Sequence, residues 1–371
     1  MTYVSLKDSL NRNTITHIAR IVGACYNSFD QKGFVDTAMT NLYSLELKQR
    51  VHHIIEALHL YLPKDFSETA KILERTALHW ENYKTNDFYS IFTAWPVTDY
   101  VRIHGINNPL LALPLLKKLT LLFSAEFAIR PFIERYPTQT WKFLHECADS
   151  ECDHVRRLAS EGCRPRLPWA TQLKKLIKDP APILVLLDKI KTDNSSYVRR
   201  SVANNLNDIA KDHPKTIIDI CSRWKKDTSI ETSWIIRHAT RTLIKKGHPD
   251  VFQLLDYTEN PKVELKQLKL TNKTVFLGGK LKFSFELNSN TNNKQNLTID
   301  YAIHYQKANG KTSPKIYKLK NLKLEGNKFA FISKIQSFKP LSTRKFYRGT
   351  HKLEILINGI SKGKADFILQ S

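Results

Sequence analysis

Residues 153–163, "DHVRRLASEGC", decide the fold because two later stretches repeat their pattern. "SYVRRSVANNL" occupies residues 196–206, and "SWIIRHATRTL" occupies residues 233–243. The three copies share apolar positions, which are Val155, Val198 and Ile235, then Ala159, Val202 and Ala239, then Cys163, Leu206 and Leu243. Apolar residues at steps of three and four are typical of one face of a helix. The sequence therefore predicts a repeated helical unit.

The spacing of the copies predicts a helical solenoid. The offsets are 43 and 37 residues, and a unit of this length with a Val-Arg pair at the start of its second helix resembles a HEAT repeat. Stacked units of this kind form a curved solenoid with a concave face. Helical spacing also runs through residues 45–62, 108–136 and 216–224, and prolines punctuate these stretches as helix boundaries should. We expect the solenoid to cover residues 1–257.

A different pattern begins near residue 260. Stretches such as "LGGKLKFSFELNS" (277–289) and "LTIDYAIHYQK" (297–307) alternate apolar and polar residues, and turns such as "KANGK" (307–311) separate them. About seven short strands in this length are typical of an immunoglobulin-like β-sandwich. The predicted fold is mainly α, a HEAT-like repeat α-solenoid followed by an all-β immunoglobulin-like sandwich at residues 262–371. "YTENP" (257–261) is the expected linker.

The protein is strongly basic, and most of the excess charge lies in the β module. Its 58 Lys and Arg residues against 35 Asp and Glu give a formal net charge of +23. Residues 260–371 contain 22 of the basic residues and only 6 of the acidic ones. Such a charge favours a polyanionic partner. A lysine-rich genome would also place lysine on any surface, so both explanations stay open for the β module.

Several classes of protein are disfavoured. The chain has no apolar run near the roughly 18 residues of a membrane span. Its first residues carry early charges and lack the apolar segment of a signal peptide, so we expect none. Five cysteines without a paired framework suit a reducing cytosol. The cysteines and histidines between 145 and 163 match no zinc-finger spacing, and we expect neither a metal nor a cofactor.

Three acidic residues stand in this basic background at intervals of about one repeat. Glu161 lies among four arginines, Glu126 lies 35 residues before it, and Asp208 lies one repeat after it. An acid opposes phosphate binding, so each one is a candidate for stabilising a cation. The alternative is structural, because Arg157 and Arg164 stand four and three residues from Glu161, where ion pairs form on one helix face.

Long stretches of the solenoid resemble the AlkC-type alkylation-repair DNA glycosylases, which are relatives of the AlkD type in the HEAT-like superfamily. The resemblance is carried by "FTAWPVTDYVRIHGINNPLLALPLLKKLTLLFSAEFAIRPFIERYP" (92–137), "HVRRLASEGCRPRLPWA" (154–170) and "YVRRSVANNLNDIAKDHP" (197–214). Residues 6–11 and 44–63 extend it, so that it covers essentially all of residues 1–255. The lysine-rich β module is not universal in that family.

The resemblance implies a monofunctional glycosylase of base excision repair that removes cationic N-alkylated bases, notably 3-methyladenine and 3-methylcytosine. A cationic base leaves readily, so the sugar, which becomes oxocarbenium-like, is the species to stabilise. Carboxylates can do so or can orient the water, and an aromatic ring adds a cation–π contact. The expected catalytic residues are Glu126, Glu161, Asp208 and Trp169. The acid that activates water, and whether the base is flipped, stay open.

We expect the basic residues to hold duplex DNA. Arg157, Arg200 and Arg237 occupy equivalent places in the three repeats and would form a basic ladder along the phosphates. The whole expected set is Arg130, Arg157, Arg164, Arg166, Arg199, Arg200, Asn204, Arg237 and Arg241. Asn204 and Asn205 could instead bridge repeats. The expected partner is double-stranded DNA with alkylated bases, bound by a monomer in the cytoplasm at the nucleoid.

Two other functions compete with this one. A non-catalytic HEAT scaffold could bind nucleic acid through the same arginines, but it needs no acids on its basic face. A protein–protein adaptor predicts an apolar or mixed concave face instead. Among the tryptophans, Trp80, Trp141 and Trp224 stand at helical spacing and are expected in the core, whereas Trp95 suits either core or groove.

Overall fold

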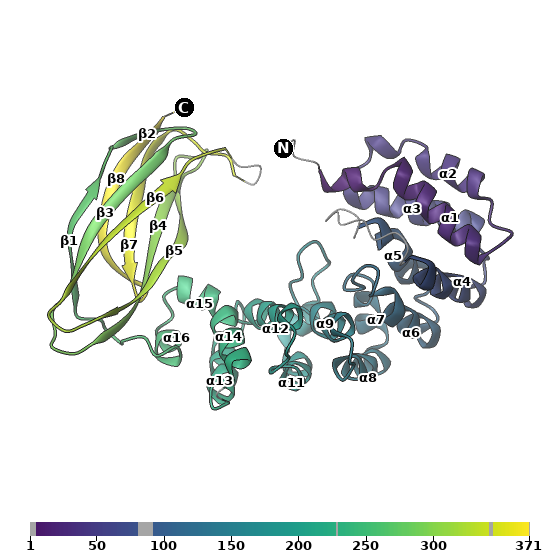
Figure 1. The fold of residues 1–371 in the computed structure, drawn as a ribbon, viewed down its shortest axis with the longest axis horizontal. Coiled ribbons are helices and arrows are strands. Elements are labelled where there is room, and N and C mark those ends of the chain that lie inside the picture. The colour runs from purple at the N-terminus through teal and green to yellow at the C-terminus, as the bar shows by residue number, and fades with distance from the viewer. Residues whose placement is uncertain (1–4, 81–91, 228, 341–343, 371) are drawn as a thin grey trace. The chain divides into compact units, whose positions relative to one another are not determined.

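The computed structural model describes residues 5–80, 92–227, 229–340 and 344–370. It confirms the predicted fold class, since helices run to α16 and an all-β module follows (Figure 1). The chain divides into two compact units, of which the first holds residues 1–212 and 229–235 and the second holds residues 213–228 and 236–371. Across the described residues, no helix has the length and apolar character that a bilayer crossing needs.

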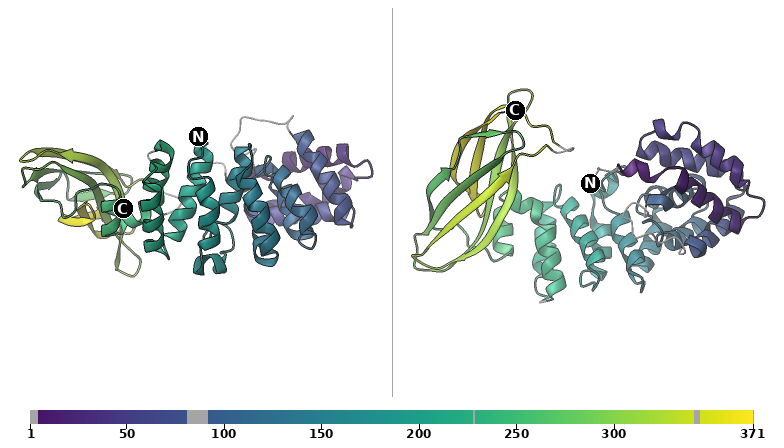
Figure 2. Two further views of the ribbon diagram at one scale, coloured as in Figure 1. Left: turned by 90° about the horizontal axis from the view of Figure 1, so that it is seen from below. Right: turned by 45° about the horizontal axis from the view of Figure 1, so that its top comes forward.

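The described part of the first unit consists mainly of helices, and Figure 2 shows them stacked side by side. Proline stands in the first turn of α5, α6, α7, α8 and α11, where its missing N–H has no helical partner to lose. The helices are α1 (Arg12–Cys25), α2 (Gln31–Met39), α3 (Leu47–Tyr61), α4 (Phe66–His79), α5 (Trp95–His104), α6 (Pro109–Leu119), α7 (Arg130–Arg135), α8 (Pro137–Ala148), α9 (Asp153–Gly162), α10 (Lys174–Lys178), α11 (Ala181–Lys189) and α12 (Ser196–Ile209), with short 3₁₀ turns at Leu6–Ser9 and Leu42–Ser44.

Helices α9 and α12 carry two copies of the predicted repeat, and they pack against each other. Their shared apolar positions are buried, as the period of the sequence requires. Asn205 in α12 donates a hydrogen bond to the main-chain oxygen of Ser160 in α9 at 2.8 Å, so it bridges the two repeats. Gly162 is the last residue of α9 and packs closely on Ile129, since a Cβ there would lie 2.5 Å from a methyl group of Ile129.

The first arginine of each Val-Arg-Arg triplet holds the loop that precedes its own helix. Arg156 Nη1 donates to the main-chain oxygens of residues 150 and 151, and Arg199 Nη1 donates to those of residues 193 and 194. The acceptors lie six and five residues before the arginine in both repeats. Arg199, which the sequence suggests as a DNA contact, therefore serves the structure of its own repeat.

The second unit combines the last helices with two β-sheets. The sheet orders are β1-β3-β6 and β2-β8-β7-β4-β5, and all pairs are antiparallel except β2 with β8. Helix α14 (Ile230–Ala239) is divided between the two units. The other elements are α13 (Pro214–Trp224), α15 (Arg241–Lys245), α16 (Pro249–Leu254), β1 (Val263–Leu270), β2 (Thr274–Phe276), β3 (Lys280–Ser289), β4 (Gln295–Gln306), β5 (Thr312–Leu324), β6 (Phe329–Ser337), β7 (Gly349–Ile357) and β8 (Ile360–Gln370).

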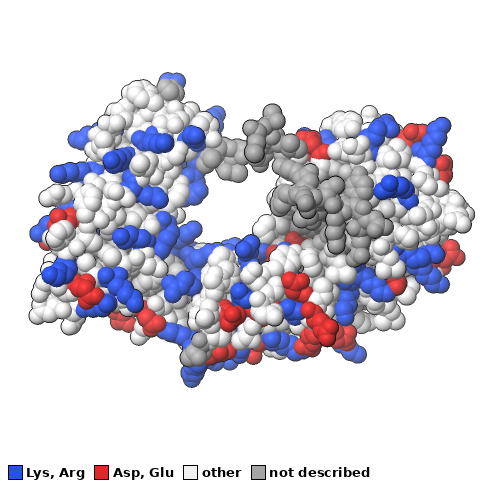
Figure 3. Space-filling view, in the orientation of Figure 1, with Lys and Arg blue, Asp and Glu red and all other residues white. Residues whose placement is uncertain are grey.

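Alternating residues of the strands form the core between the sheets. Phe283 and Phe285 of β3 are fully buried, and Tyr301 of β4 lies with its ring centroid 5.2 Å from that of Phe283. Many outward positions are polar, although Phe329, Phe331 and Ile335 of β6 are exposed. On the face of this module that Figure 3 shows, Lys and Arg side chains are scattered widely and outnumber the acidic ones.

The expected linker is tied down within the second unit. Thr258 N donates to the main-chain oxygen of Asn296 at 2.9 Å, and Asn358 Nδ2 donates to the main-chain oxygen of Thr258 at 2.7 Å. Gly247, just before α16, and Gly359, between β7 and β8, approach so closely that a Cβ on Gly359 would lie 2.6 Å from the Cα of Gly247. These contacts explain why the last helices and the β module form one compact unit.

Candidate active site

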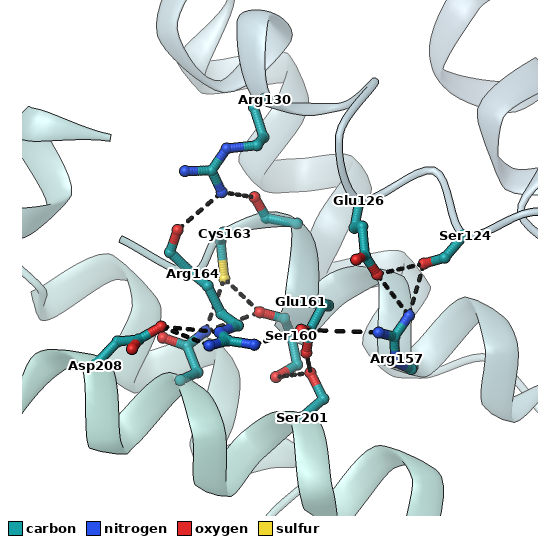
Figure 4. Close-up of polar contacts among 12 residues, drawn as sticks. Ser124, Glu126, Arg130, Arg157, Ser160, Glu161, Cys163, Arg164, Ser201 and Asp208 are labelled. Carbon is teal, nitrogen blue, oxygen red and sulfur yellow. Dashed lines mark hydrogen bonds and ion pairs between the residues drawn. The ribbon is translucent and has the colours of Figure 1, made fainter. Parts of the chain in front are cut away.

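Five charged side chains form a continuous chain of ion pairs in the first unit (Figure 4). Arg157 Nη1 lies 2.7 Å from Glu126 Oε2, and Arg157 Nη2 lies 3.7 Å from Glu161 Oε1. Arg164 Nη1 lies 2.5 Å from Glu161 Oε1, and Arg164 Nη2 lies 2.8 Å from Asp208 Oδ2. Three carboxylates thus alternate with two guanidiniums, and we call these five residues the acid–arginine chain.

The acid–arginine chain is assembled from three segments. Helix α9 presents Arg157 and Glu161 one turn apart, and Arg164 follows its end, as the spacing in the sequence predicts. Glu126 comes from the segment between α6 and α7, and Asp208 comes from α12. Glu161 and Asp208 are 5% and 3% exposed. Glu126 is partly buried. Unpaired charges at such depth would be costly, so the alternation of charge is what allows the three acids to lie together here.

A cavity of about 460 Å³ opens on the acid–arginine chain. Its walls include Glu126, Arg157, Glu161, Arg164, Trp169 and Tyr197. Three of the four expected catalytic residues are therefore brought together. Asp208 is not among the lining residues and reaches the site through Arg164, because it lies one helical turn beyond the position equivalent to Glu161.

The two glutamates of the cavity differ in how their oxygens are used. Glu161 accepts from Arg164 on Oε1 and from Ser201 Oγ on Oε2 at 2.5 Å. Glu126 accepts from Ser124 Oγ on Oε2 at 2.8 Å and pairs with Arg157 through the same oxygen. Within the described parts of the chain, no hydrogen bond reaches Glu126 Oε1. Burial raises the pKa of the Glu126 carboxyl, and the Arg157 guanidinium opposes that shift.

Trp169 stands exposed at the mouth of the cavity on the loop between α9 and α10. Its φ is +65°, a left-handed conformation that non-glycine residues rarely adopt, and the residue is 54% exposed. A second cavity of about 340 Å³ shares Trp169 and Phe127 with the first. Behind them, Trp95 is buried and stacks on Phe123 and Phe127 with centroid separations of 5.3 Å, and it also lines the second cavity. Trp95 therefore belongs both to the core and to a cavity wall.

Tyr197 is a cavity residue that the sequence analysis missed. The Arg157 guanidinium lies 4.6 Å from the centroid of the Tyr197 ring, so the aromatic face adds a cation–π contact to the ion pairs of Arg157. The signal was available, since Tyr197 in "YVRR" occupies the place of His154 in "HVRR", and both line the cavity.

Two of the arginines expected on DNA are buried instead. Arg130 is 4% exposed and Arg164 is 7% exposed. Arg164 is engaged by two carboxylates, and Arg130 donates only to main-chain oxygens in its described contacts. The structure thus replaces their expected phosphate contacts by internal ones, because tertiary packing encloses both side chains.

The basic ladder is not continuous within one unit. Arg157 belongs to the acid–arginine chain, Arg200 is exposed on α12, and Arg237 lies in the second unit, where its Nη1 is 3.4 Å from the Tyr257 hydroxyl. A phosphate contact stays a prediction for Arg200 and Arg237. The Arg157 guanidinium pairs with the carboxylates of Glu126 and Glu161.

The remaining expected DNA residues lie nearer the surface. Arg166 forms a bidentate pair with Asp212, with both nitrogen–oxygen distances at 2.8 Å. Arg241 donates to the main-chain oxygen of His238 at 2.6 Å, and Asn204 is partly buried on α12. Their roles on DNA also stay predictions.

The fold and the site define a helical-repeat protein with a C-terminal immunoglobulin-like module and a cavity of buried carboxylates, and comparison with known proteins agrees. Residues 264–371 match the family described as the C-terminal Ig-like domain of the uncharacterised protein YhaZ. YhaZ of Bacillus subtilis is 36% identical over 363 residues, which is 98% of each chain.

A solved structure matches as well. The alkylpurine DNA glycosylase AlkC of Pseudomonas fluorescens, bound to DNA that contains an abasic-site analogue, superposes with a TM-score of 0.93 at 36% identity. The match covers 99% of this chain and 100% of the AlkC chain. The chain therefore belongs to the family of AlkC and YhaZ.

Proposed function

We propose that this protein is a monofunctional DNA glycosylase that hydrolyses the N-glycosidic bond of 3-methyladenine and 3-methylcytosine in duplex DNA. The observation that carries the proposal is the cavity in which Glu126 and Glu161 stand beside the exposed ring of Trp169. A surface that only bound phosphates would lose affinity by placing carboxylates there. The full-length similarity to AlkC supports the same conclusion.

The cavity suits a reaction that passes through a cationic sugar. When the bond from C1′ to the base nitrogen breaks, its electron pair neutralises the base cation and leaves the sugar oxocarbenium-like. Glu161 is a fixed negative charge that stabilises this cation, because Arg164 and Ser201 hold both of its oxygens. The ring of Trp169 packs against the deoxyribose and adds a cation–π contact.

Glu126 is the better candidate for orienting the attacking water. Its Oε2 is held by Ser124 and Arg157, which fixes the carboxylate while Oε1 can accept from a water. Burial raises its pKa, which makes it a stronger base than an ordinary glutamate. The water oxygen bonds to C1′ and its proton passes to this carboxylate. Asp208 is not among the residues that line the cavity, and it acts by orienting Arg164.

The test is the release of free bases. Duplex DNA methylated to contain both lesions is incubated with the protein, and the soluble fraction is separated by chromatography. We expect 3-methyladenine and 3-methylcytosine in solution and abasic, uncut strands in the DNA. Binding of the DNA without release above the protein-free control would contradict the proposal and support the non-catalytic scaffold.

A further inference from the structure

We infer that Arg130 is a positioning residue for Trp169, which it holds at the cavity by clamping both arms of the Trp169 loop without contacting DNA. The inference rests on the proposed function, since it concerns the part of the site that meets the sugar. We define the Trp169 loop as residues 163–173, between α9 and α10.

One guanidinium ties the two arms of the Trp169 loop together. Arg130 Nη1 donates to the main-chain oxygens of Gly162 and Arg164 at 3.0 and 2.8 Å (Figure 4). Arg130 Nε and Nη2 donate to the main-chain oxygen of Thr171 at 3.2 and 2.7 Å. The acceptors before and after Trp169 are therefore fixed to the same rigid, planar group.

The loop needs such a clamp because Trp169 is held in an unfavourable state. A left-handed conformation costs a non-glycine residue roughly 1–2 kcal/mol. An exposed indole ring also gains little from burial. Within the loop, Ala170 N donates to the main-chain oxygen of Leu167, and Leu173 N donates to that of Pro165. Only the second of these bonds joins the two arms, and the four donations from Arg130 reinforce it.

A second tether supports the same arrangement from α3. Lys48 Nζ donates to the main-chain oxygen of Trp169 itself. Backbone strain that the surroundings hold in place is characteristic of functional sites. Two cations from different helices thus hold the strained residue that carries the exposed ring.

The burial of Arg130 separates this role from phosphate binding. The residue is 4% exposed, and its described contacts from Nε, Nη1 and Nη2 all go to main-chain oxygens. Removal of the fork should therefore displace the ring and slow the reaction, but leave the number of phosphate contacts unchanged.

A double-mutant cycle tests the inference. Arg130→Lys keeps the charge but cannot reach three carbonyl groups, and we expect a loss of roughly 10–100-fold in single-turnover excision, the range that misplacement of a reacting group produces. In a Trp169→Ala background the same change should cost less than about twofold, because the group that it positions is already gone. The salt dependence of DNA affinity should stay as in the unaltered protein.

Two further variants test the second tether and provide a control. Lys48→Gln removes the second tether and should give a smaller loss that also disappears in the Trp169→Ala background. Arg156→Lys is the matched control, since Arg156 also clamps a loop by its guanidinium but lies outside the cavity lining. It should lower the melting temperature and leave the excision rate of folded protein unchanged.

Three results would overturn the inference. The first is a double variant whose fold loss in excision rate equals the product of the Arg130→Lys and Trp169→Ala losses. The second is an unchanged excision rate in Arg130→Lys. The third is a salt slope of DNA affinity that falls by about one in Arg130→Lys, as loss of a phosphate contact produces. Failure of the unaltered protein to release bases would overturn the proposed function, and this inference with it. Multiplicative effects in a protein that does excise would overturn this inference alone.

Discussion

Glu126 and Glu161 share Arg157 but differ in what holds their remaining oxygens, and this difference is the basis of the separate roles proposed for them. The sequence predicts the pairs of Glu161 with Arg157 and Arg164, because their spacing places them on one helix face. It could not show that Glu126 reaches the same arginine, since that contact joins segments 31 residues apart. A catalytic role for Glu161 stays a prediction, and a structural role is compatible with it because a buried ion pair can serve both.

The raised pKa of Glu126 predicts how excision depends on pH. A carboxyl with a raised pKa takes up its proton at a higher pH than the roughly 4.3 of an ordinary glutamate, and the protonated form cannot accept a proton from water. The single-turnover rate should therefore fall as the pH is lowered, with a midpoint above that value. Rates measured from pH 8 down to pH 4.5 check this, and a rate that stays flat over the whole range would contradict it.

At the scale of elements, the periodic apolar positions are enough to predict the repeat, and the arginines are not. Each of these two repeats has two adjacent arginines, Arg156 with Arg157 and Arg199 with Arg200. In both pairs the first arginine donates hydrogen bonds to main-chain oxygens of the loop before its own helix. Only the path of the preceding loop decides this, and a single sequence does not give that path. Arg130 shows the same limit, because its partners lie 32 to 41 residues away.

The hydrogen bonds from Arg156 to the loop before α9 lead to a prediction about stability. In Arg156→Ala, two main-chain oxygens lose a charged donor and Asp193 loses its cationic partner, whose Nε lies 2.5 Å from Asp193 Oδ2. We expect the free energy of unfolding to drop by about 2–4 kcal/mol, as for the loss of a partly buried ion pair with its hydrogen bonds. Urea denaturation measures this. The excision rate per folded molecule should not change, and a stability within 0.5 kcal/mol of the unaltered protein, roughly the effect of a surface substitution, would contradict the clamp.

At the scale of the whole molecule, composition and pattern were sufficient for the order of a helical solenoid and an immunoglobulin-like module. They did not predict where the compact units divide. The helices after residue 213 group with the β module because Thr258, Asn358 and the close pair of glycines tie them together. Those contacts join residues up to 112 positions apart, which no local pattern reveals.

The lysines of β5 carry a prediction about DNA binding. Lys315, Lys320 and Lys323 are exposed along this edge strand of the five-stranded sheet. Lysine on an edge strand also hinders aggregation, so a test has to separate the two roles. We predict that changing all three to Gln lowers the salt slope of duplex affinity by about one for each lost phosphate contact.

Lysines of the other sheet provide the control for β5. Lys269, Lys280 and Lys282 are also exposed, on β1 and β3. Changing these three to Gln should lower the salt slope of duplex affinity less than the β5 change does. Fluorescence anisotropy at several salt concentrations gives both slopes. Equal slopes in the β5 variant and the unaltered protein would show that these lysines serve solubility alone.

The most direct test of the catalytic site is single-turnover excision by Glu126→Gln and Glu161→Gln, with melting temperature and DNA affinity measured on the same samples. Ser201→Ala is the matched control, because it removes a hydrogen bond from Glu161 but no charge. We predict that each amide slows excision by roughly 10–1000-fold, the effect of losing one preorganised electrostatic group. DNA affinity should hold or rise, because a negative charge near phosphate is removed. Ser201→Ala should lower stability and change the rate far less. Normal excision in both amide variants, with any loss confined to melting temperature, would contradict the account.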